Sequence, residues 1–369
     1  MSNTTPTCVI INSRYADFSI ERSVLEPLGV RVITVTNDSY SQPKQQGQTS
    51  QQTSSLLPEE IDENAFIKSA RDADALLINL AKVTKTVIDA LPRLKVISRY
   101  GVGLDNIDVT YAQSKGISVL NVPDYCTDEV AEHTLALMLA LLRGIPCRSQ
   151  AVKTGLWDLP EPQFVLRGQT LGIIGYGNTA RAVIARSLAF KPAEILVYSR
   201  HIGHAATGQI TKNNLQTNKY ESNINPDSDT DTYPLVTMAQ YFHVPLRFVP
   251  LETLLTQSTI ISLHTGLSPQ TYRMLDKRAF SQMKRGVFIV NTARGGLIDF
   301  DALYEAIENG IVKGAGLDVF ETEPPISMLT KLTSDKLILS DHTAFRSVHS
   351  IEELKRRCAQ NAARGLGLL

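Results

Sequence analysis

The segment 287–319 constrains the fold most, because it begins and ends with apolar runs that have the composition of buried strands. Between the two runs, Asp299 is suited to cap a helix that Gly310 would end. Leu303 and Ile307 are four residues apart and would lie on one face of that helix. Two strands joined by a crossover helix form a parallel pair, so the segment predicts a βαβ unit of an α/β protein.

Ionisable side chains follow both strands of this unit. Arg294 comes after the first strand, and Asp318 and Glu323 come after the second. The carboxyl ends of parallel strands meet at one edge of a sheet, which is where open α/β sheets bind ligands. The segment therefore predicts an active-site edge.

A glycine motif predicts that a nucleotide binds at such an edge. The motif Gly175-x-Gly177-x-x-Ala180 stands between an apolar strand pattern and an amphipathic helix pattern. Its first glycine allows a tight turn, its second lets a pyrophosphate approach the backbone, and its third small residue lets the helix pack closely. Phosphate would lie at the helix N-terminus, where N–H groups and the helix dipole favour an anion. Such a motif alone is often a tight turn, but this context favours a dinucleotide site.

Several segments carry a family resemblance. These are "RYGVGLDNIDVTYAQSKG", "LRGQTLGIIGYGNTARAV", "VNTARGGLID", "GAGLDVFETEPP" and "DHTAFRSVHSIEELKRR". In sequence and order they resemble the D-isomer-specific 2-hydroxyacid dehydrogenase family, in its C-terminal-binding-protein-like and phosphoglycerate-dehydrogenase-like branch. The resemblance implies an α/β fold, with a Rossmann-type doubly wound nucleotide-binding domain (124–344) inserted in a smaller flavodoxin-like substrate domain (1–123 and 345–369).

The resemblance also implies a catalytic trio, Arg294, Glu323 and His342. Arg294 and the backbone N–H groups of Val102 and Gly103 would bind the carboxylate of a 2-keto acid, and Arg294 would polarise its carbonyl. His342 would supply the proton, because imidazole titrates near neutrality. Glu323 would orient the ring and favour its protonated form.

Cofactor contacts are expected at the glycine motif and at the strand ends beside it. Asp318 would bind the nicotinamide carboxamide, as the resemblance implies, and His264 would touch a ribose. The full set of expected cofactor residues is Gly175, Tyr176, Gly177, Asn178, Thr179, Ser199, Arg200, His264, Thr265, Thr292, Ala293 and Asp318.

The choice between NAD and NADP is predicted by the residues after the second strand of the nucleotide-binding domain. An NAD enzyme of this fold carries an Asp or Glu there, which binds the adenosine ribose hydroxyls. Here Ser199 and Arg200 follow the strand, and they are suited to bind a 2′-phosphate. NADP is therefore favoured and NAD stays possible.

Composition fits a cytoplasmic enzyme that acts on a small molecule. The 369 residues exceed what one core supports, so two domains are expected. Lys and Arg together number 37, as do Asp and Glu, so nucleic acid is not an expected partner. No apolar run is long enough for a bilayer, no leader pattern is present, and the four cysteines lack metal-ligand spacing, so neither membrane nor metal is expected. The resemblance implies a homodimer, with the arm around Trp157 in the interface.

Other segments are harder to interpret. Residues 37–55 and 208–234 are poor in apolar residues and predict mobile surface insertions. The helix pattern 128–143 is apolar almost all round and predicts burial on every side, with His133 as a packing histidine. Asp341 stands where the family usually has proline, and it would either favour a protonated His342 or draw its ring away from Glu323.

Two functions remain open at this point. The favoured one is an NAD(P)-dependent oxidoreductase that interconverts a small 2-keto acid, such as glyoxylate or hydroxypyruvate, and the D-2-hydroxy acid. The alternative is a nucleotide-sensing dimeric interaction module with little turnover, as the branch resemblance allows. The complete trio favours the enzyme.

Overall fold

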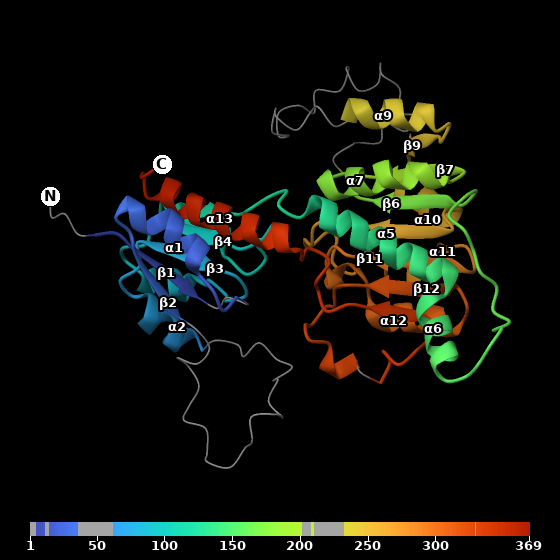
Figure 1. The fold of residues 1–369 in the computed structure, drawn as a ribbon, viewed down its shortest axis with the longest axis horizontal. Coiled ribbons are helices and arrows are strands. Elements are labelled where there is room, and N and C mark those ends of the chain that lie inside the picture. The colour runs from blue at the N-terminus through green and yellow to red at the C-terminus, as the bar shows by residue number, and fades with distance from the viewer. Residues whose placement is uncertain (1–4, 12–14, 36–61, 201–207, 210–231, 329) are drawn as a thin grey trace, which may run out of the picture. The chain divides into compact units, whose positions relative to one another are not determined.

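The computed structural model describes residues 5–11, 15–35, 62–200, 208–209, 232–328 and 330–369 (Figure 1). The chain forms two compact units, and each is described by itself. Unit 1 is Met1–Tyr125 with Arg346–Leu369, and unit 2 is Cys126–Phe345. The sequence predicted boundaries after residues 123 and 344, and the units divide after residues 125 and 345.

Unit 1 contains a sheet of five parallel strands in the order β2-β1-β3-β4-β5. This is the flavodoxin-like order that the sequence predicted. Helix α13 packs against α1 and against the central strands β3 and β4. The strands are β1 (Thr7–Ile11), β2 (Arg31–Val35), β3 (Ala75–Ile78), β4 (Val96–Arg99) and β5 (Ser118–Leu120). The helices are α1 (Ser19–Leu25), η1 (Glu26–Leu28), α2 (Glu63–Ala70), α3 (Lys85–Ala90), α4 (Val109–Ser114) and α13 (Val348–Gly365).

Unit 2 contains an eight-stranded sheet in the order β13-β12-β11-β10-β6-β7-β9-β8, in which β8 alone is antiparallel to its neighbour. The first strand of this sheet along the chain is β6. Strands β7 and β9 lie in turn on one side of β6, and the chain then returns to form β10 on its other side. This reversal is that of the doubly wound Rossmann fold, which confirms the predicted fold class. The strands are β6 (Thr170–Ile174), β7 (Glu194–Tyr198), β8 (Gly208–Gln209), β9 (Leu246–Phe248), β10 (Ile260–Leu263), β11 (Val287–Asn291), β12 (Val312–Leu317) and β13 (Leu337–Leu339).

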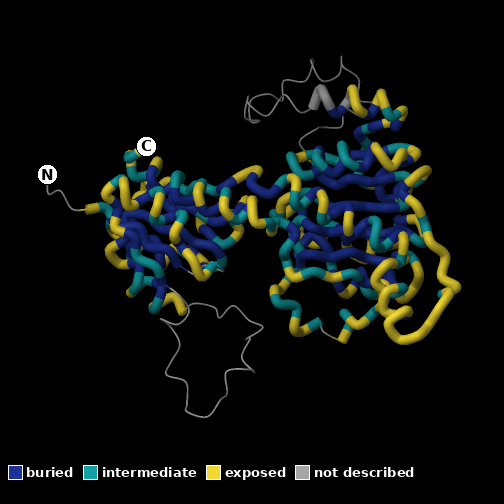
Figure 2. Tube along the Cα trace, viewed as in Figure 1, coloured by how far each residue is buried: buried dark blue, intermediate teal, exposed yellow. Residues whose placement is uncertain are grey.

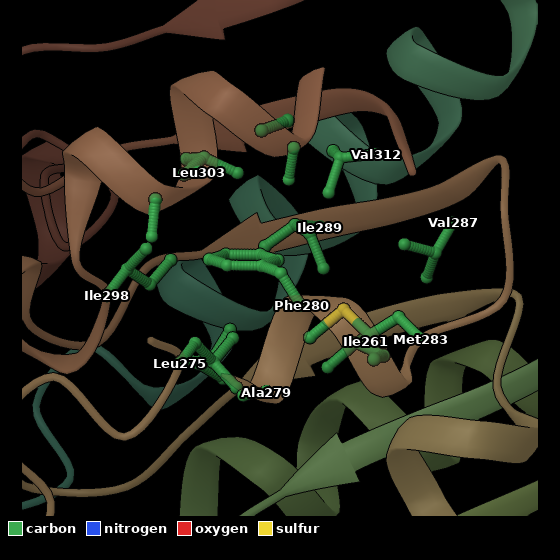
Figure 3. Packing of buried hydrophobic residues seen from close by; sticks show 14 of the residues in the cluster. Ile261, Leu275, Ala279, Phe280, Met283, Val287, Ile289, Ile298, Leu303 and Val312 are labelled. Atoms are coloured by element: carbon green, nitrogen blue, oxygen red, sulfur yellow. The ribbon is translucent and has the colours of Figure 1, made fainter. Parts of the chain in front are cut away.

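Helices cover both faces of this sheet, since successive strand residues face opposite sides. Ile173 and Val290 belong to the core under α5 and α7, whereas Ile174 and Ile289 belong to the core under α10, α11 and α12. Figure 2 shows the buried strands between the helices, and Figure 3 shows the second core around Phe280. The helices are α5 (Thr127–Arg143), α6 (Ile145–Lys153), α7 (Asn178–Ser187), η3 (Leu188–Phe190), α9 (Thr232–Tyr241), α10 (Leu251–Gln257), α11 (Lys277–Gln282), η6 (Gly295–Leu297), α12 (Phe300–Glu308) and η7 (Ile326–Met328).

Helix α5 packs closely against the sheet because β12 carries glycines where the two meet. A Cβ atom added to Gly316 would lie 3.0 Å from Leu137 Cβ of α5. The prediction that α5 is buried on every side is wrong for this chain, because Glu132 and Ala136 are exposed. The helix contacts β11, β12 and α7 with its inner face, and this leaves an outer strip open.

Most of the two predicted insertions lies outside the described residues. Residues 37–55 are not described. Of 208–234, the structure describes 208–209, which form β8, and 232–234, which begin α9. For these five residues the predicted loop is wrong, since they belong to a strand and a helix. Within the described chain no single helix combines the length and apolar composition of a membrane span, although the bent pair α5 and α6 does so together.

Candidate active site

The strand order reverses between β6 and β10, and the glycine motif begins at this point. Gly175 follows β6 with a φ of 108°, in the region that favours glycine. A Cβ atom there would lie 2.2 Å from the carbonyl oxygen of His264, which follows β10. Gly175 N–H donates to Tyr198 O at 2.7 Å, at the end of β7. Three strand ends therefore meet at Gly175, and no larger residue fits.

The N-terminus of α7 fits an anion such as a pyrophosphate. Gly177 is the N-cap, no described side chain caps the helix, and its first turn contains no acidic residue. A Cβ atom at Gly177 would meet no described atom within 4 Å, so the backbone is open to a close approach. The first turn presents N–H groups and the positive end of the helix dipole. The residues present therefore fit the predicted dinucleotide.

Two of the predicted cofactor residues use their side chains within the protein. The Tyr176 ring packs edge-on against Phe248 at 5.0 Å. The Asn178 Oδ1 atom accepts a hydrogen bond from the buried Arg181 guanidinium. Thr179 lies half-buried in the first turn of α7. We therefore expect Tyr176 and Asn178 to contact a cofactor through their backbones.

Ser199 and Arg200 follow β7, the strand next to β6. Arg200 is exposed, and its Nη1 atom lies 3.4 Å from Ser268 Oγ in the loop after β10. Position 199 carries a hydroxyl where an NAD-specific enzyme has a carboxylate. Thr265 lies in the same loop, beside Gly175.

His264 is held in a neutral state. Burial lowers the pKa of His264 to about 3. Its Nε2 atom lies 2.9 Å from Ser262 Oγ. A neutral ring suits the predicted ribose contact, and it argues against proton transfer by His264 near neutral pH.

Glu323 and His342 form a close pair. The His342 Nδ1 atom lies 2.6 Å from Glu323 Oε2, and the two side chains are 33% and 29% exposed. The other carboxylate oxygen of Glu323 accepts a hydrogen bond from Phe320 N–H at 3.0 Å. The carboxylate is thus fixed at one oxygen and orients the imidazole with the other, which leaves Nε2 of His342 as the nitrogen that can face a substrate.

Arg294 lies in the loop after β11, and this loop touches the segment that carries Glu323. A Cβ atom at the next residue, Gly295, would lie 1.9 Å from the carbonyl carbon of Phe320. Asn291 Nδ2 donates to Arg294 O at 2.9 Å and fixes the turn. The Nη1 atom of Arg294 donates to Ala293 O at 2.8 Å. The two loops therefore lie in direct contact, as the βαβ pattern predicted.

Asp318 is buried and binds a turn of its own chain. Its Oδ1 atom accepts hydrogen bonds from Ser340 Oγ at 2.6 Å and from Thr343 N–H at 3.0 Å. Its Oδ2 atom accepts one from Ala344 N–H at 3.0 Å. The turn between these partners contains His342 at a φ of 53°, which is uncommon for a residue with a side chain. The expected contact of Asp318 with the carboxamide stays a prediction, since both oxygens are already used here.

Thr292 is also turned into the protein. Its hydroxyl lies 2.8 Å from that of Thr134 on α5, and both residues are buried. Ala293 N–H donates to Asn291 Oδ1 at 3.0 Å. The expected cofactor contacts of these two residues stay predictions.

Asp341 does not compete with Glu323 for the imidazole. Its Oδ1 atom accepts a hydrogen bond from Thr343 Oγ1 at 3.0 Å, while His342 Nδ1 is bonded to Glu323. Of the two consequences left open by the sequence, the structure therefore excludes the displaced ring.

A cluster that sequence reasoning missed supports the Glu323 loop. Glu321 accepts hydrogen bonds from Tyr272 Oη at 2.5 Å and from Arg273 Nη2 at 3.1 Å. Both hydrogen bonds lower the pKa of Glu321, and the bond from Tyr272 has the larger effect. Arg273 also reaches Asp299 at 3.4 Å. The sequence offered one signal for this cluster, because Glu321 lies two residues before the expected catalytic residue Glu323.

Val102 and Gly103 belong to unit 1, in the loop after β4. Asn121 Nδ2 donates to Val102 O at 2.7 Å, and Val122 N–H donates to Gly101 O at 3.0 Å, which fixes the loop. The N–H groups of Val102 and Gly103 have no acceptor among the described residues. The loop thus presents two donors of the kind that binds a carboxylate.

Comparisons with known proteins identify related sequences. The family described as D-isomer specific 2-hydroxyacid dehydrogenase, NAD binding domain, matches residues 135–224 and 230–344. The hydroxypyruvate reductase of Thermotoga maritima is 36% identical over 78% of this chain and 83% of its own. The glyoxylate reductase of Thermofilum pendens is 36% identical over 82% of this chain and 79% of its own.

Solved structures share the fold over nearly the whole chain. The D-lactate dehydrogenase of Aquifex aeolicus, complexed with NAD and lactic acid, is 25% identical with a TM-score of 0.73, over 98% of this chain and 96% of its own. A glyoxylate reductase of Paecilomyes thermophila is 25% identical with a TM-score of 0.73, over 96% and 94%.

Proposed function

Because the chain belongs to the D-isomer-specific 2-hydroxyacid dehydrogenase family, we propose that it reduces a small 2-keto acid to the D-2-hydroxy acid, or catalyses the reverse. The observation that carries the proposal is the contact between Glu323 and His342, 2.6 Å apart at the carboxyl edge of the sheet. An imidazole oriented by a carboxylate is suited to proton transfer, which binding of a nucleotide does not use. The geometry therefore favours the enzyme over the interaction module.

The residues divide the reaction between binding and proton transfer. The Arg294 guanidinium and the N–H groups of Val102 and Gly103 are assigned to the substrate carboxylate. The glycine motif and the N-terminus of α7 would hold the pyrophosphate of the reduced cofactor, which would supply a hydride for the carbonyl carbon of the substrate. Protonated His342 donates its Nε2 proton to the carbonyl oxygen as negative charge develops there, and Glu323 stabilises the imidazolium. The neutral ring then takes up one proton from the solvent, so each turnover would consume one hydride from the cofactor and one solvent proton.

A panel of 2-keto acids tests the proposal. Glyoxylate, hydroxypyruvate and larger analogues are assayed with NADPH and NADH, and the product is separated by chiral chromatography. We expect the D-isomer, and we expect His342→Ala to lower kcat by roughly two to four decades, the usual worth of a general acid. Arg294→Ala should raise KM for the keto acid by about one to two decades, with NADPH binding retained. Wild-type protein without turnover on the panel, or a fully active His342→Ala variant, would contradict the proposal.

NADP(H) is the proposed cofactor in preference to NAD(H). Ser199 and Arg200 support this, because a hydroxyl and a guanidinium are suited to bind a 2′-phosphate, whereas a carboxylate would repel it. Arg200→Ala should raise KM for NADPH by roughly one to two decades and leave KM for NADH little changed. NADH serves as the control within the same variant. A wild-type enzyme that uses NADH better than NADPH at equal concentration would overturn the assignment.

A homodimer is the proposed assembly. The end of α6 and the arm that follows it expose large apolar side chains: Val152 in α6 is 56% exposed, and Leu156 and Trp157 in the arm are 58% and 84% exposed. Apolar side chains grouped in this way favour a protein interface. Light scattering should give twice the chain mass of 40.6 kDa, and Leu156→Glu should reduce it. We also propose a cytoplasmic location, and the four free cysteines support a reducing compartment.

A further inference from the structure

Two neighbouring residues of α5 reach the two segments that carry the proposed catalytic groups. His133 Nε2 lies 2.9 Å from Ser340 Oγ, two residues before His342. Thr134 Oγ1 lies 2.8 Å from Thr292 Oγ1, two residues before Arg294. From the sequence, His133 was expected only to pack in an apolar helix, and the structure shows that it bonds to the catalytic segment.

The direction of each hydrogen bond follows from counting protons. Ser340 Oγ donates its only proton to Asp318 Oδ1 at 2.6 Å, and the N–H groups of Thr343 and Ala344 donate to the same side chain. Ser340 Oγ must then accept from His133, whose Nε2 carries a proton and lies 3.6 Å from Asp318 Oδ1. His133 thus extends a chain of donors that ends on the buried carboxylate holding the His342 turn.

The second contact can be oriented in the same way. Thr134 donates its only hydroxyl proton to Val130 O at 2.7 Å. The Thr134 oxygen must therefore accept from Thr292, which fixes the hydroxyl of Thr292 and the start of the Arg294 loop. Both partners are buried, and an unpaired hydroxyl at this place would be costly.

We propose that His133 and Thr134 are positioning residues of the active site. His133 acts through Ser340 and Asp318 on the turn that presents His342. Thr134 acts through Thr292 on the loop that presents Arg294. Neither residue is assigned a contact with substrate or cofactor, and the inference rests on the proposed function of those two catalytic groups.

The two residues are predicted to affect different kinetic constants. His133→Phe keeps an aromatic ring and loses the donor, so kcat should fall about tenfold with KM for the keto acid nearly unchanged. Thr134→Val keeps the shape and loses the acceptor, so KM should rise about fivefold with kcat less affected. His133→Gln can donate from nearly the same position and should recover most of the wild-type kcat. Glu132→Gln, on the exposed face of the same helix, is the matched control and should behave as wild type.

Two further measurements separate positioning from a loss of stability. In a double-mutant cycle, His133→Phe should add little to Ser340→Ala, because His133 acts on Asp318 through the Ser340 hydroxyl. Crystal structures of wild type and of His133→Phe give the distance between His342 Nδ1 and Glu323 Oε2, which should lengthen in the variant. This distance does not depend on turnover, so it judges the inference even if no 2-keto acid is reduced. Equal kcat in His133→Phe and wild type, equal losses in the Phe and Gln variants, or an unchanged turn would overturn the inference.

Discussion

His264 should make the stability of the protein depend on pH in a way that can be calculated. In the folded protein its pKa is lowered by burial to about 3, whereas the ordinary value is 6.5. The folded state therefore prefers the neutral ring, and its stability is complete above pH 6.5 and is lost as pH falls toward 3. Protonation of His264 in the unfolded chain lowers the free energy of unfolding by about 2 kcal/mol at pH 5 and by about 0.2 kcal/mol at pH 7.

The measurement compares wild type with His264→Gln, since a glutamine amide can replace Nε2 in the contact with Ser262. Urea unfolding followed by circular dichroism gives the free energy of unfolding at pH 7 and at pH 5. The other titrating groups are the same in both proteins, so their contributions to the pH dependence of the free energy of unfolding cancel in the difference. Wild type should lose about 2 kcal/mol more than the variant between the two pH values. Equal losses in both proteins would refute the argument that the folded protein holds His264 as a neutral ring.

Other substitutions test the surroundings of the site. Gly175→Ala places a Cβ atom 2.2 Å from His264 O at a strained φ, and should destabilise unit 2 by at least about 2 kcal/mol and abolish NADPH binding, measured by calorimetry. Glu321→Gln should lower the free energy of unfolding at pH 7, measured in urea. This difference should be complete above the ordinary pKa of 4.5 and be lost as pH falls below it through the folded pKa, which the bond from Tyr272 lowers. Leu303→Ala, in the core of Figure 3, should cost about 2–5 kcal/mol in urea unfolding, and a smaller loss would show that this core relaxes.

Several features of the site could be predicted from the sequence because they depend on local patterns. The turn at Gly175, the cap at Asp299 and the strand ends before Arg294 and Asp318 each follow from a few neighbouring residues. The parallel βαβ arrangement then places the strand ends at one edge without further information. The family resemblance added His342 and the catalytic role of Glu323, which no local pattern assigns.

Other features depend on contacts between residues far apart in the chain. His133 and Ser340 are 207 positions apart, and their hydrogen bond exists only because α5 packs beside β12 and β13. The sequence therefore predicted only an apolar helix in which His133 packs. The use of Asp318 to hold the His342 turn was hidden for the same reason, since its partners come from a loop beyond the next strand.

The sequence by itself determined which elements form and at which edge of the sheet the ionisable residues emerge, because hydrophobic periodicity and turn residues act over a few positions. Tertiary structure alone decided which of those residues are exposed to a ligand and which are used inside the protein. The physical reason is that a buried polar group must find a hydrogen-bond partner, and packing decides which partner lies within reach. Glu323 thus binds His342, while Asp318 and Thr292 are bonded within the fold.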